Sequence, residues 1–287
     1  MTQHTLPPSL ENLQSLAPGL PYPLLRLANT LGYGKLADAF MGAAIDRLQN
    51  PALRPFQPVL ERLRISYDIQ GATLGAIPST GTPLVVVANH PYGLADGLIA
   101  GDIISRVRRD FKIVANPIVA GRGSGYDPHL LPINPKIKTL TQHAQRTRVL
   151  LSAMHHLQGG GCVVIFPSGS VARPAYLGAP VTDAPWRDFA AYMVAKIRGP
   201  VSALPLHFLG TNSMTYEMLH TLGLKGPTRI AMMAHETLRL AGKTLEVRMG
   251  QAITKNEMPA LEQKNRRIER ADLKQLTGFL RAKTLGL

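Results

Sequence analysis

The sequence has one cysteine, few aromatic residues and no long apolar run. The single Cys162 excludes a disulfide within the chain and a cysteine-based zinc site. It lies in the apolar run 161–166, where we expect a small core side chain. No stretch approaches the roughly 20 apolar residues that a membrane-spanning helix needs, and the first residues lack the pattern of a secretory signal. We therefore expect a cytoplasmic protein.

Acidic residues are also scarce relative to basic ones. Lys and Arg number 32 against 18 Asp and Glu, a formal net charge of +14, which favours anionic partners. Aromatic residues make up only 6% and no nucleic-acid-binding module is recognisable, so no nucleic-acid partner is expected. An anionic membrane surface or a phosphate-bearing cosubstrate fits the charge better.

Short apolar runs alternate with helical patterns from Thr82 onward. This rhythm predicts an α/β fold with a mostly parallel, mixed central sheet covered by helices. We expect an N-terminal helical extension, 1–70, and one α/β domain, 71–287, since no internal repeat or low-complexity linker is present. Strands are predicted near 84–88, 111–115, 161–166, 201–209, 229–233 and 245–249, and helices near 96–109, 140–157, 186–197 and 272–281.

The extension carries apolar residues at helical spacing over 20–31, 35–48 and 55–63. Residues 22–31 are strongly apolar with a lone cation, Arg26. Such a helix can lie in a membrane interface or pack on the domain, and the pattern favours neither.

The most informative motif follows the predicted strand 84–88, which ends at His90 in a Pro/Gly turn. The carboxyl end of a sheet strand is where open α/β folds bind ligands. The turn can bring Asp96 to the ring, so that the carboxylate fixes the tautomer while the other ring nitrogen takes a proton from a hydroxyl. The alternative is that His90 and Asp96 merely satisfy a turn and cap a helix.

The segment 89–96, which reads Asn-His-Pro-Tyr-Gly-Leu-Ala-Asp, resembles the first block of the glycerolipid and lysophospholipid acyltransferases. The resemblance is closest to the hemolysin-like, lyso-ornithine lipid O-acyltransferase branch. The common family form has four residues between His and Asp, whereas five separate His90 from Asp96, a spacing similar to that of this branch. The resemblance covers roughly residues 84–250 and implies His90 and Asp96 as the catalytic residues.

A second block, Phe-Pro-Ser-Gly at 166–169, resembles the family's Phe-Pro-Glu-Gly, which helps to hold the acyl acceptor. Ser168 stands where the family has glutamate, which leaves the acceptor open. A nearby arginine suits a phosphate or carboxylate group. The resemblance thus implies an acceptor site formed by Arg122, Phe166, Pro167, Ser168, Gly169 and Arg173.

The run 201–208 resembles the last family block, a strand with an internal proline. Pro205 predicts a sheet edge or a bulge. His207 is expected to be buried and satisfied, and Asn212 to line a pocket or cap a helix.

The resemblance implies an O-acyltransferase that moves a fatty acyl group from acyl-CoA or acyl-carrier protein to the hydroxyl of a lysolipid. It implies no cofactor beyond that cosubstrate, and the His155–His156 pair lacks a metal-ligand spacing. Such an enzyme would sit peripherally on the inner face of the cytoplasmic membrane. Two alternatives remain: a lipid hydrolase, although no Gly-x-Ser-x-Gly elbow occurs, and a catalytically silent lipid-binding protein, which Ser168 favours.

Overall fold

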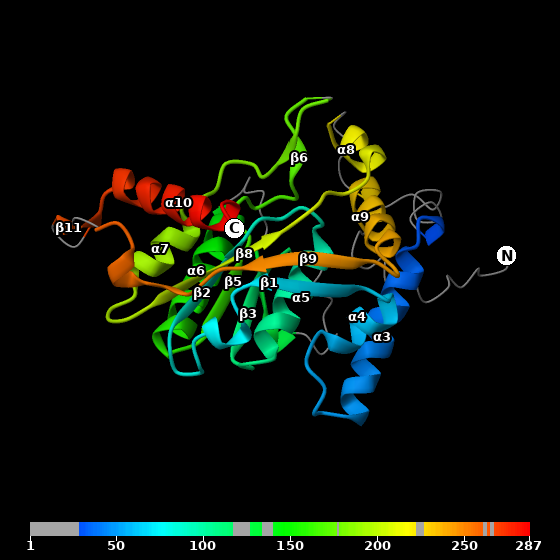
Figure 1. The fold of residues 1–287 in the computed structure, drawn as a ribbon, viewed down its shortest axis with the longest axis horizontal. Coiled ribbons are helices and arrows are strands. Elements are labelled where there is room, and N and C mark those ends of the chain that lie inside the picture. The colour runs from blue at the N-terminus through cyan, green and yellow to red at the C-terminus, as the bar shows by residue number, and fades with distance from the viewer. Residues whose placement is uncertain are drawn as a thin grey trace.

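The computed structural model describes residues 29–116, 127–133, 140–176, 178–221, 227–260, 263–264 and 267–287. Eight strands of these residues form one sheet in the order β1-β9-β8-β2-β5-β3-β4, with β10 also paired to β8 (Figure 1). The pairs are parallel except β8–β9 and β8–β10. The strands are β1 Ser66–Gly71, β2 Leu84–Ala88, β3 Phe111–Ala115, β4 Leu130–Pro132, β5 Cys162–Ile165, β8 Ser202–Phe208, β9 Thr244–Met249 and β10 Ile253–Thr254.

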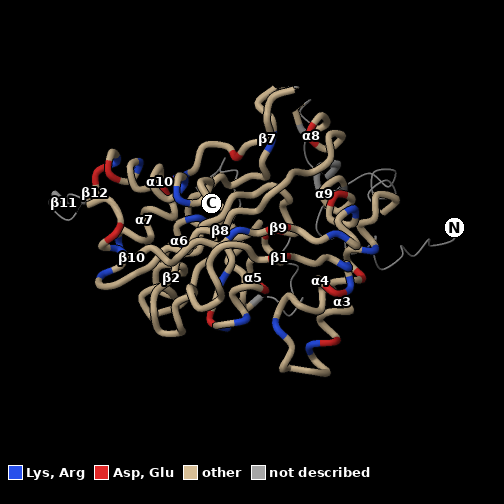
Figure 2. Tube along the Cα trace, viewed as in Figure 1, with Lys and Arg blue, Asp and Glu red and all other residues tan. Residues whose placement is uncertain are grey.

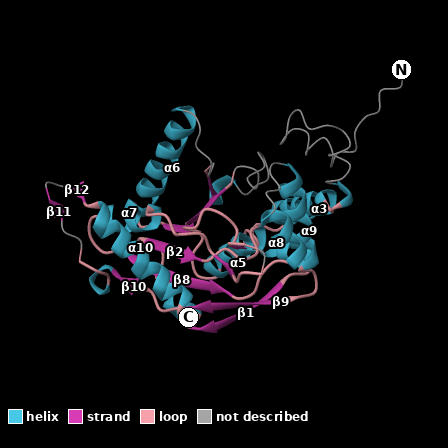
Figure 3. Cartoon of the chain, turned by 90° about the horizontal axis from the view of Figure 1, so that it is seen from above, coloured by secondary structure: helices cyan, strands magenta, loops and turns pink. Residues whose placement is uncertain are grey.

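Helices cover both faces of this sheet, as Figure 3 shows from above. The mostly parallel, mixed α/β sheet predicted from the sequence is confirmed. The helices are α3 Tyr33–Gln49, α4 Gln57–Leu63, α5 Leu94–Ser105, α6 Leu140–Gln158, α7 Phe189–Lys196, α8 Met214–Thr221, α9 Pro227–Arg239 and α10 Arg270–Leu285. Short 3-10 helices are η1 Leu74–Ala76, η2 Asp127–His129 and η3 Lys255–Glu257, and two small hairpins are β6 Arg173–Pro174 with β7 Val181–Thr182 and β11 Gln263–Lys264 with β12 Arg267–Ile268.

Strand β2 lies at the centre because every one of its side chains is apolar and fully buried. Leu84, Val86 and Ala88 face the core made with α3, α4, α5 and α9. Val85 and Val87 face the core made with α6, α7 and α10. A run buried on both faces is what a central parallel strand requires.

The described residues before Gly71 are only partly helical. Helices α3 and α4 match the predicted 35–48 and 55–63, but Ser66–Gly71 forms the edge strand β1, so a wholly helical extension is wrong at this point. Buried residues of α3 and α4 belong to the same core cluster as β2. The division at residue 70 as a domain boundary stays a prediction, and the predicted helix 20–31 lies almost wholly outside the described residues.

The strand predicted at 229–233 is also wrong, because these residues lie inside helix α9. A short apolar run fits a helix and a strand equally well. Here the helix continues to Arg239, and its buried residues Met232 and Ala234 pack into two different core clusters.

Pro205 lies in the central strand β8 rather than at a sheet edge. The bulge that was predicted as the alternative is present in the neighbouring chain segment. Leu206 pairs with Met249, whereas Ala203 pairs with Ile253, so three residues, 250–252, lie opposite two residues, 204–205, of β8. Proline has no backbone N–H to donate in a regular strand ladder. Because the register is irregular at Pro205, no such hydrogen bond is required there.

No helix within the described ranges is both long and apolar enough to cross a bilayer. Figure 2 shows Lys and Arg on many elements of the chain trace, including α10 and α9, interspersed with Asp and Glu. The positive charge is therefore distributed along the fold.

Candidate active site

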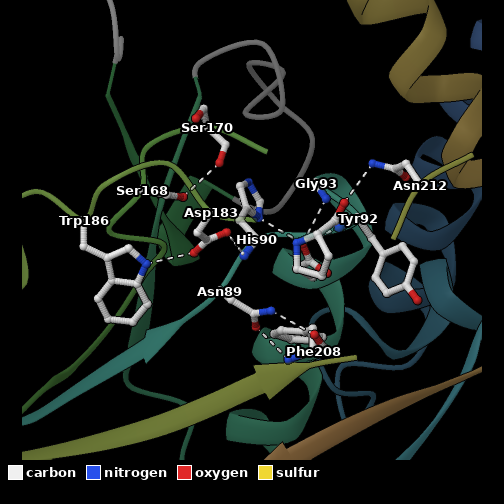
Figure 4. Close-up of polar contacts among 12 residues, drawn as sticks. Asn89, His90, Tyr92, Gly93, Ser168, Ser170, Asp183, Trp186, Phe208 and Asn212 are labelled. Atoms are coloured by element: carbon white, nitrogen blue, oxygen red, sulfur yellow. Dashed lines mark hydrogen bonds and ion pairs between the residues drawn. The ribbon is translucent and has the colours of Figure 1, made fainter. Parts of the chain in front are cut away.

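The end of strand β2 is fastened to strand β8 by the side chain of Asn89. Its Nδ2 donates to the Phe208 carbonyl (2.8 Å), and its Oδ1 accepts the Phe208 N–H (2.7 Å). Both residues are buried, so this reciprocal pair satisfies groups that water cannot reach (Figure 4). The backbone directly before His90 is therefore held in place at the carboxyl end of the sheet.

His90 and Asp96 form the predicted dyad. His90 Nδ1 lies 3.0 Å from Asp96 Oδ2, and the Asp96 side chain is completely buried. The ring's other nitrogen, Nε2, makes no hydrogen bond to any described part of the chain, and the His90 side chain keeps 19% of its surface exposed. Asp96 thus holds His90 at Nδ1, while Nε2 on the other side of the ring has no partner among the described residues.

Asp96 reaches the ring because it is the third residue of helix α5 and folds back over the helix start. The same oxygen, Oδ2, accepts the backbone N–H groups of Tyr92 and Gly93, each at 2.9 Å. A carboxylate at this position commonly satisfies the free N–H groups of a helix N-terminus. The capping role that was the alternative to a dyad is therefore present together with the contact to His90.

Burial raises the pKa of Asp96 above its ordinary value. The hydrogen bond and charge of His90, and then the N–H groups of Tyr92 and Gly93, act in the opposite direction. A buried carboxylate in this setting is stabilised by a neighbouring positive charge. A positive charge on a neighbouring group would therefore offset part of the cost of burying the Asp96 carboxylate.

The turn between His90 and Asp96 depends on glycine. Gly93 has φ +76°, and a Cβ there would come within 3.0 Å of Val171 Cγ2 and 3.2 Å of Met233 Sδ. Asn212 Nδ2 donates to the Pro91 carbonyl at 2.8 Å, so the residue expected to line a pocket or cap a helix holds this turn instead. Only a residue without a side chain fits this backbone.

Phe166 is the predicted acceptor residue that the structure brings to His90. The two rings stack with centroids 4.2 Å apart and planes 25° apart. Phe166 follows β5, which pairs in parallel with β2, so both turns emerge at the same edge of the sheet. The stack fixes the ring plane of His90.

The remaining residues of the second block form a tight turn. Ser168 is buried, and its hydroxyl donates to the Ser170 carbonyl at 2.8 Å, within the turn itself. Gly169 has φ +66°, and the Pro167 carbonyl accepts the Arg187 N–H at 3.0 Å. The Ser168 hydroxyl therefore shapes the turn.

Of the two predicted arginines, one lies near the His90 turn. Arg173 is exposed on β6, paired with Thr182 of β7, and follows Ala172, whose N–H donates to the His90 carbonyl at 2.8 Å. Arg122 lies outside the described residues.

Three residues near the His90 turn and the turn 166–169 were not predicted from the sequence: Asp183, Trp186 and Arg187. Asp183 Oδ1 accepts the His90 backbone N–H at 3.0 Å, and its Oδ2 accepts the indole N–H of Trp186 at 2.8 Å. The guanidinium of Arg187 lies over Gly169, 3.4 to 3.7 Å from the position of a Cβ there. A carboxylate three residues before the chain's only tryptophan was the available signal.

His207 and Cys162 were predicted to be core residues, and only the cysteine is. His207 is only partly buried and its Nδ1 has no partner among the described residues, so the expected satisfied histidine is wrong. Burial lowers the pKa of His207, assisted by the charge of Arg248. Cys162 is buried as predicted, and burial raises its pKa to about 12, which removes thiolate chemistry at neutral pH.

Within the described ranges, no group of three His, Cys, Asp or Glu residues is arranged to hold a metal ion.

The chain has a structural neighbour among known proteins but no match by sequence. No family model and no curated protein matches the chain. Among solved structures, the 1-acyl-sn-glycerophosphate (LPA) acyltransferase PlsC from Thermotoga maritima aligns with 92% of this chain and 97% of its own, at 13% identity and a TM-score of 0.46.

Proposed function

We propose that the protein is an O-acyltransferase that moves a fatty acyl group from an acyl thioester to the hydroxyl of a lysolipid. The observation that carries the proposal is the His90–Asp96 dyad. Asp96 is wholly buried, holds Nδ1 at 3.0 Å, and leaves Nε2 without a partner among the described residues at the carboxyl end of the sheet. This is the arrangement that a general base for an alcohol requires.

The chemistry follows from this geometry. His90 Nε2 takes the proton of the acceptor hydroxyl as its oxygen forms a bond to the thioester carbonyl carbon. The resulting imidazolium is stabilised by Asp96, whose buried carboxylate gains a charged partner. The carbon–sulfur bond then breaks, the thiol leaves with the proton from His90, and the ester remains on the acceptor. No protein nucleophile is needed.

The acceptor is proposed to lie along the turn 166–169. Phe166 is stacked on the His90 ring, so this turn adjoins the base. Arg173 and Arg187 are exposed cations on the adjoining segments that suit a phosphate or carboxylate headgroup. Pro167, Ser168 and Gly169 would then act through the shape of the turn, and Arg122 completes the proposed site from outside the described residues.

The net positive charge of the protein leads us to propose the acyl donor and the cellular location. A net charge of +14 suits an acidic acyl-carrier protein or the phosphates of acyl-CoA, and it suits the anionic inner face of the cytoplasmic membrane. Vesicle flotation tests the second idea. Binding should be stronger to anionic than to neutral vesicles and should weaken with salt, whereas equal binding to both would contradict it.

The test of function is acyl transfer by the purified protein, with lysophosphatidate or a lyso-ornithine lipid as acceptor and acyl-CoA or acyl-carrier protein as donor. His90→Ala should abolish transfer while the protein stays folded. His155→Ala, which removes an exposed histidine of helix α6, should keep full activity. Unchanged turnover in His90→Ala would contradict the mechanism. Release of free fatty acid without acceptor would instead indicate a hydrolase, and binding without turnover a lipid-binding protein.

A further inference from the structure

Both backbone polar groups of His90 are held by the two residues that flank the β6–β7 hairpin. Ala172, directly before β6, donates its N–H to the His90 carbonyl at 2.8 Å. Asp183, directly after β7, accepts the His90 N–H on Oδ1 at 3.0 Å. The two ends of the β6–β7 hairpin therefore hold the backbone of His90, the proposed base.

The Asp183 carboxylate is itself oriented from its other side. Its Oδ2 accepts the indole N–H of Trp186 at 2.8 Å, and both residues are buried (Figure 4). Burial raises the pKa of Asp183, whereas the hydrogen bonds from Trp186 and from the His90 backbone act against that rise. An ionised carboxylate only accepts hydrogen bonds, and here two donors are aimed at its two oxygens.

His90 is thus constrained in three independent ways. Asp96 fixes the ring edge at Nδ1, Phe166 fixes the ring plane, and Asp183 fixes the backbone from which the ring projects. The first two act on the ring itself and cannot compensate for a shift of the backbone. Displacement of a catalytic group by about 1 Å can cost roughly 100-fold in rate.

We propose that Asp183, held by Trp186, is a positioning residue that sets the place of the His90 backbone and thereby aims Nε2 at the acceptor hydroxyl. This inference rests on the proposed function for its kinetic consequence. Asp183 does not act as a second base, because it contacts the backbone of His90 and both of its oxygens already accept hydrogen bonds.

Three variants test the assignment by removing parts of the arrangement. Asp183→Ala removes both acceptors, Asp183→Asn keeps one acceptor oxygen for two donors, and Trp186→Phe leaves the carboxylate without its orienting donor. We expect kcat to fall by about 10- to 100-fold in Asp183→Ala, less in Asp183→Asn and least in Trp186→Phe, with KM little changed. A change in KM alone would contradict positioning of the base.

Asp102→Asn is the matched control for lost stability. Asp102 is another buried carboxylate, held by Arg54 and Tyr67 at the far end of helix α5, and it does not touch the His90 turn. The Asp102→Asn variant should have a lower thermal unfolding temperature, while its kcat stays near that of the unaltered protein. If Asp102→Asn and Asp183→Ala lose kcat equally at equal loss of stability, the positioning role is overturned.

A second measurement does not depend on turnover. The proton that His90 Nδ1 shares with Asp96 is observable by NMR in protein labelled at histidine nitrogen, and His90→Gln identifies its signal. That signal should shift or broaden in Asp183→Ala and stay unchanged in Asp102→Asn. An unchanged signal in Asp183→Ala overturns the inference, whereas absence of acyl transfer in the unaltered protein overturns only the proposed function.

Discussion

Asn89 and Phe208 exchange two hydrogen bonds, at 2.8 and 2.7 Å, across 119 positions of the sequence. The pair joins the end of β2 to the end of β8 at the point where His90 begins. Asn89→Asp keeps the acceptor for the Phe208 N–H, but it loses the donor to the carbonyl and buries a charge. We expect a loss of about 1 to 3 kcal/mol of unfolding free energy, measured by urea denaturation. An unchanged midpoint would show that the pair is not needed.

Asp96→Asn should separate catalysis from stability. The amide oxygen can replace Oδ2, which accepts all three hydrogen bonds, whereas Oδ1 has no partner among the described residues. The variant keeps these three contacts and loses the charge, but it places an amide NH2 at the buried Oδ1 position, where no described group accepts a hydrogen bond. Because burial raises the pKa of Asp96, its charge weakens the folded state at neutral pH, so removing the charge should offset part of the cost of the unpaired amide.

Turnover of Asp96→Asn should nevertheless fall about 100-fold, because the imidazolium loses its counter-charge. Acceptor binding should change little. The measurements are kcat, KM and the thermal unfolding temperature of the same preparation. A variant that is as active as the unaltered protein would exclude the charge from the mechanism.

Gly93 and Gly97 offer a matched pair of glycine substitutions. Gly93→Ala places a Cβ at φ +76° between Val171 and Met233, which we expect to cost about 1 to 3 kcal/mol and to lower activity by displacing the turn. Gly97 lies inside helix α5, and apart from its chain neighbours and the backbone of its own helix no described atom lies within 4 Å of the position that a Cβ would take there. Gly97→Ala should therefore stabilise the protein by up to about 1 kcal/mol. Equal effects of the two changes would contradict this account of the turn.

Two partly buried histidines should make the protein sensitive to mild acid. Burial lowers the pKa of His129, which stacks on Phe111, and of His156, whose Nε2 bonds the Asp110 carbonyl. Below about pH 6.5 the unfolded chain binds more protons than the folded protein, so stability falls with pH. Their contribution is fully present above that value and is lost as the pH drops toward the lower folded-state pKa values.

Urea unfolding at about pH 7.5 and pH 5.5 measures this effect. The double variant His129→Gln, His156→Gln should lose less stability between the two conditions than the unaltered protein. An identical loss in both proteins would assign the acid sensitivity to other groups.

The sequence predicted the parts of the site that are local in the chain. Residues 84–88 form one apolar run of β-branched and other apolar residues, which favours a buried strand, and His90 and Asp96 follow it within eight residues. Phe166 was predictable in the same way, since it ends the apolar run 161–166. The contact between the two turns required only that β2 and β5 be parallel neighbours.

Elements that depend on distant contacts were not predictable. Asp183 is 93 residues from His90, and its spacing to Trp186 does not indicate that the carboxylate contacts the His90 backbone. Strand β1 alternates exposed and partly buried residues at the sheet edge, so its apolar signal is weak. Residues 229–233 favour a strand when taken alone, because five residues are too few to reveal the helical period of α9, which runs from Pro227 to Arg239.

The dyad residues are six positions apart, yet their setting comes from Phe166, Asp183 and Phe208, far along the chain. Closing such long loops is slow relative to forming a helix. During refolding, helix α5 and the turn before it can form early, while the ring acquires its orientation only after β5 and β8 have docked on β2. Recovery of activity should therefore lag behind recovery of helical circular dichroism.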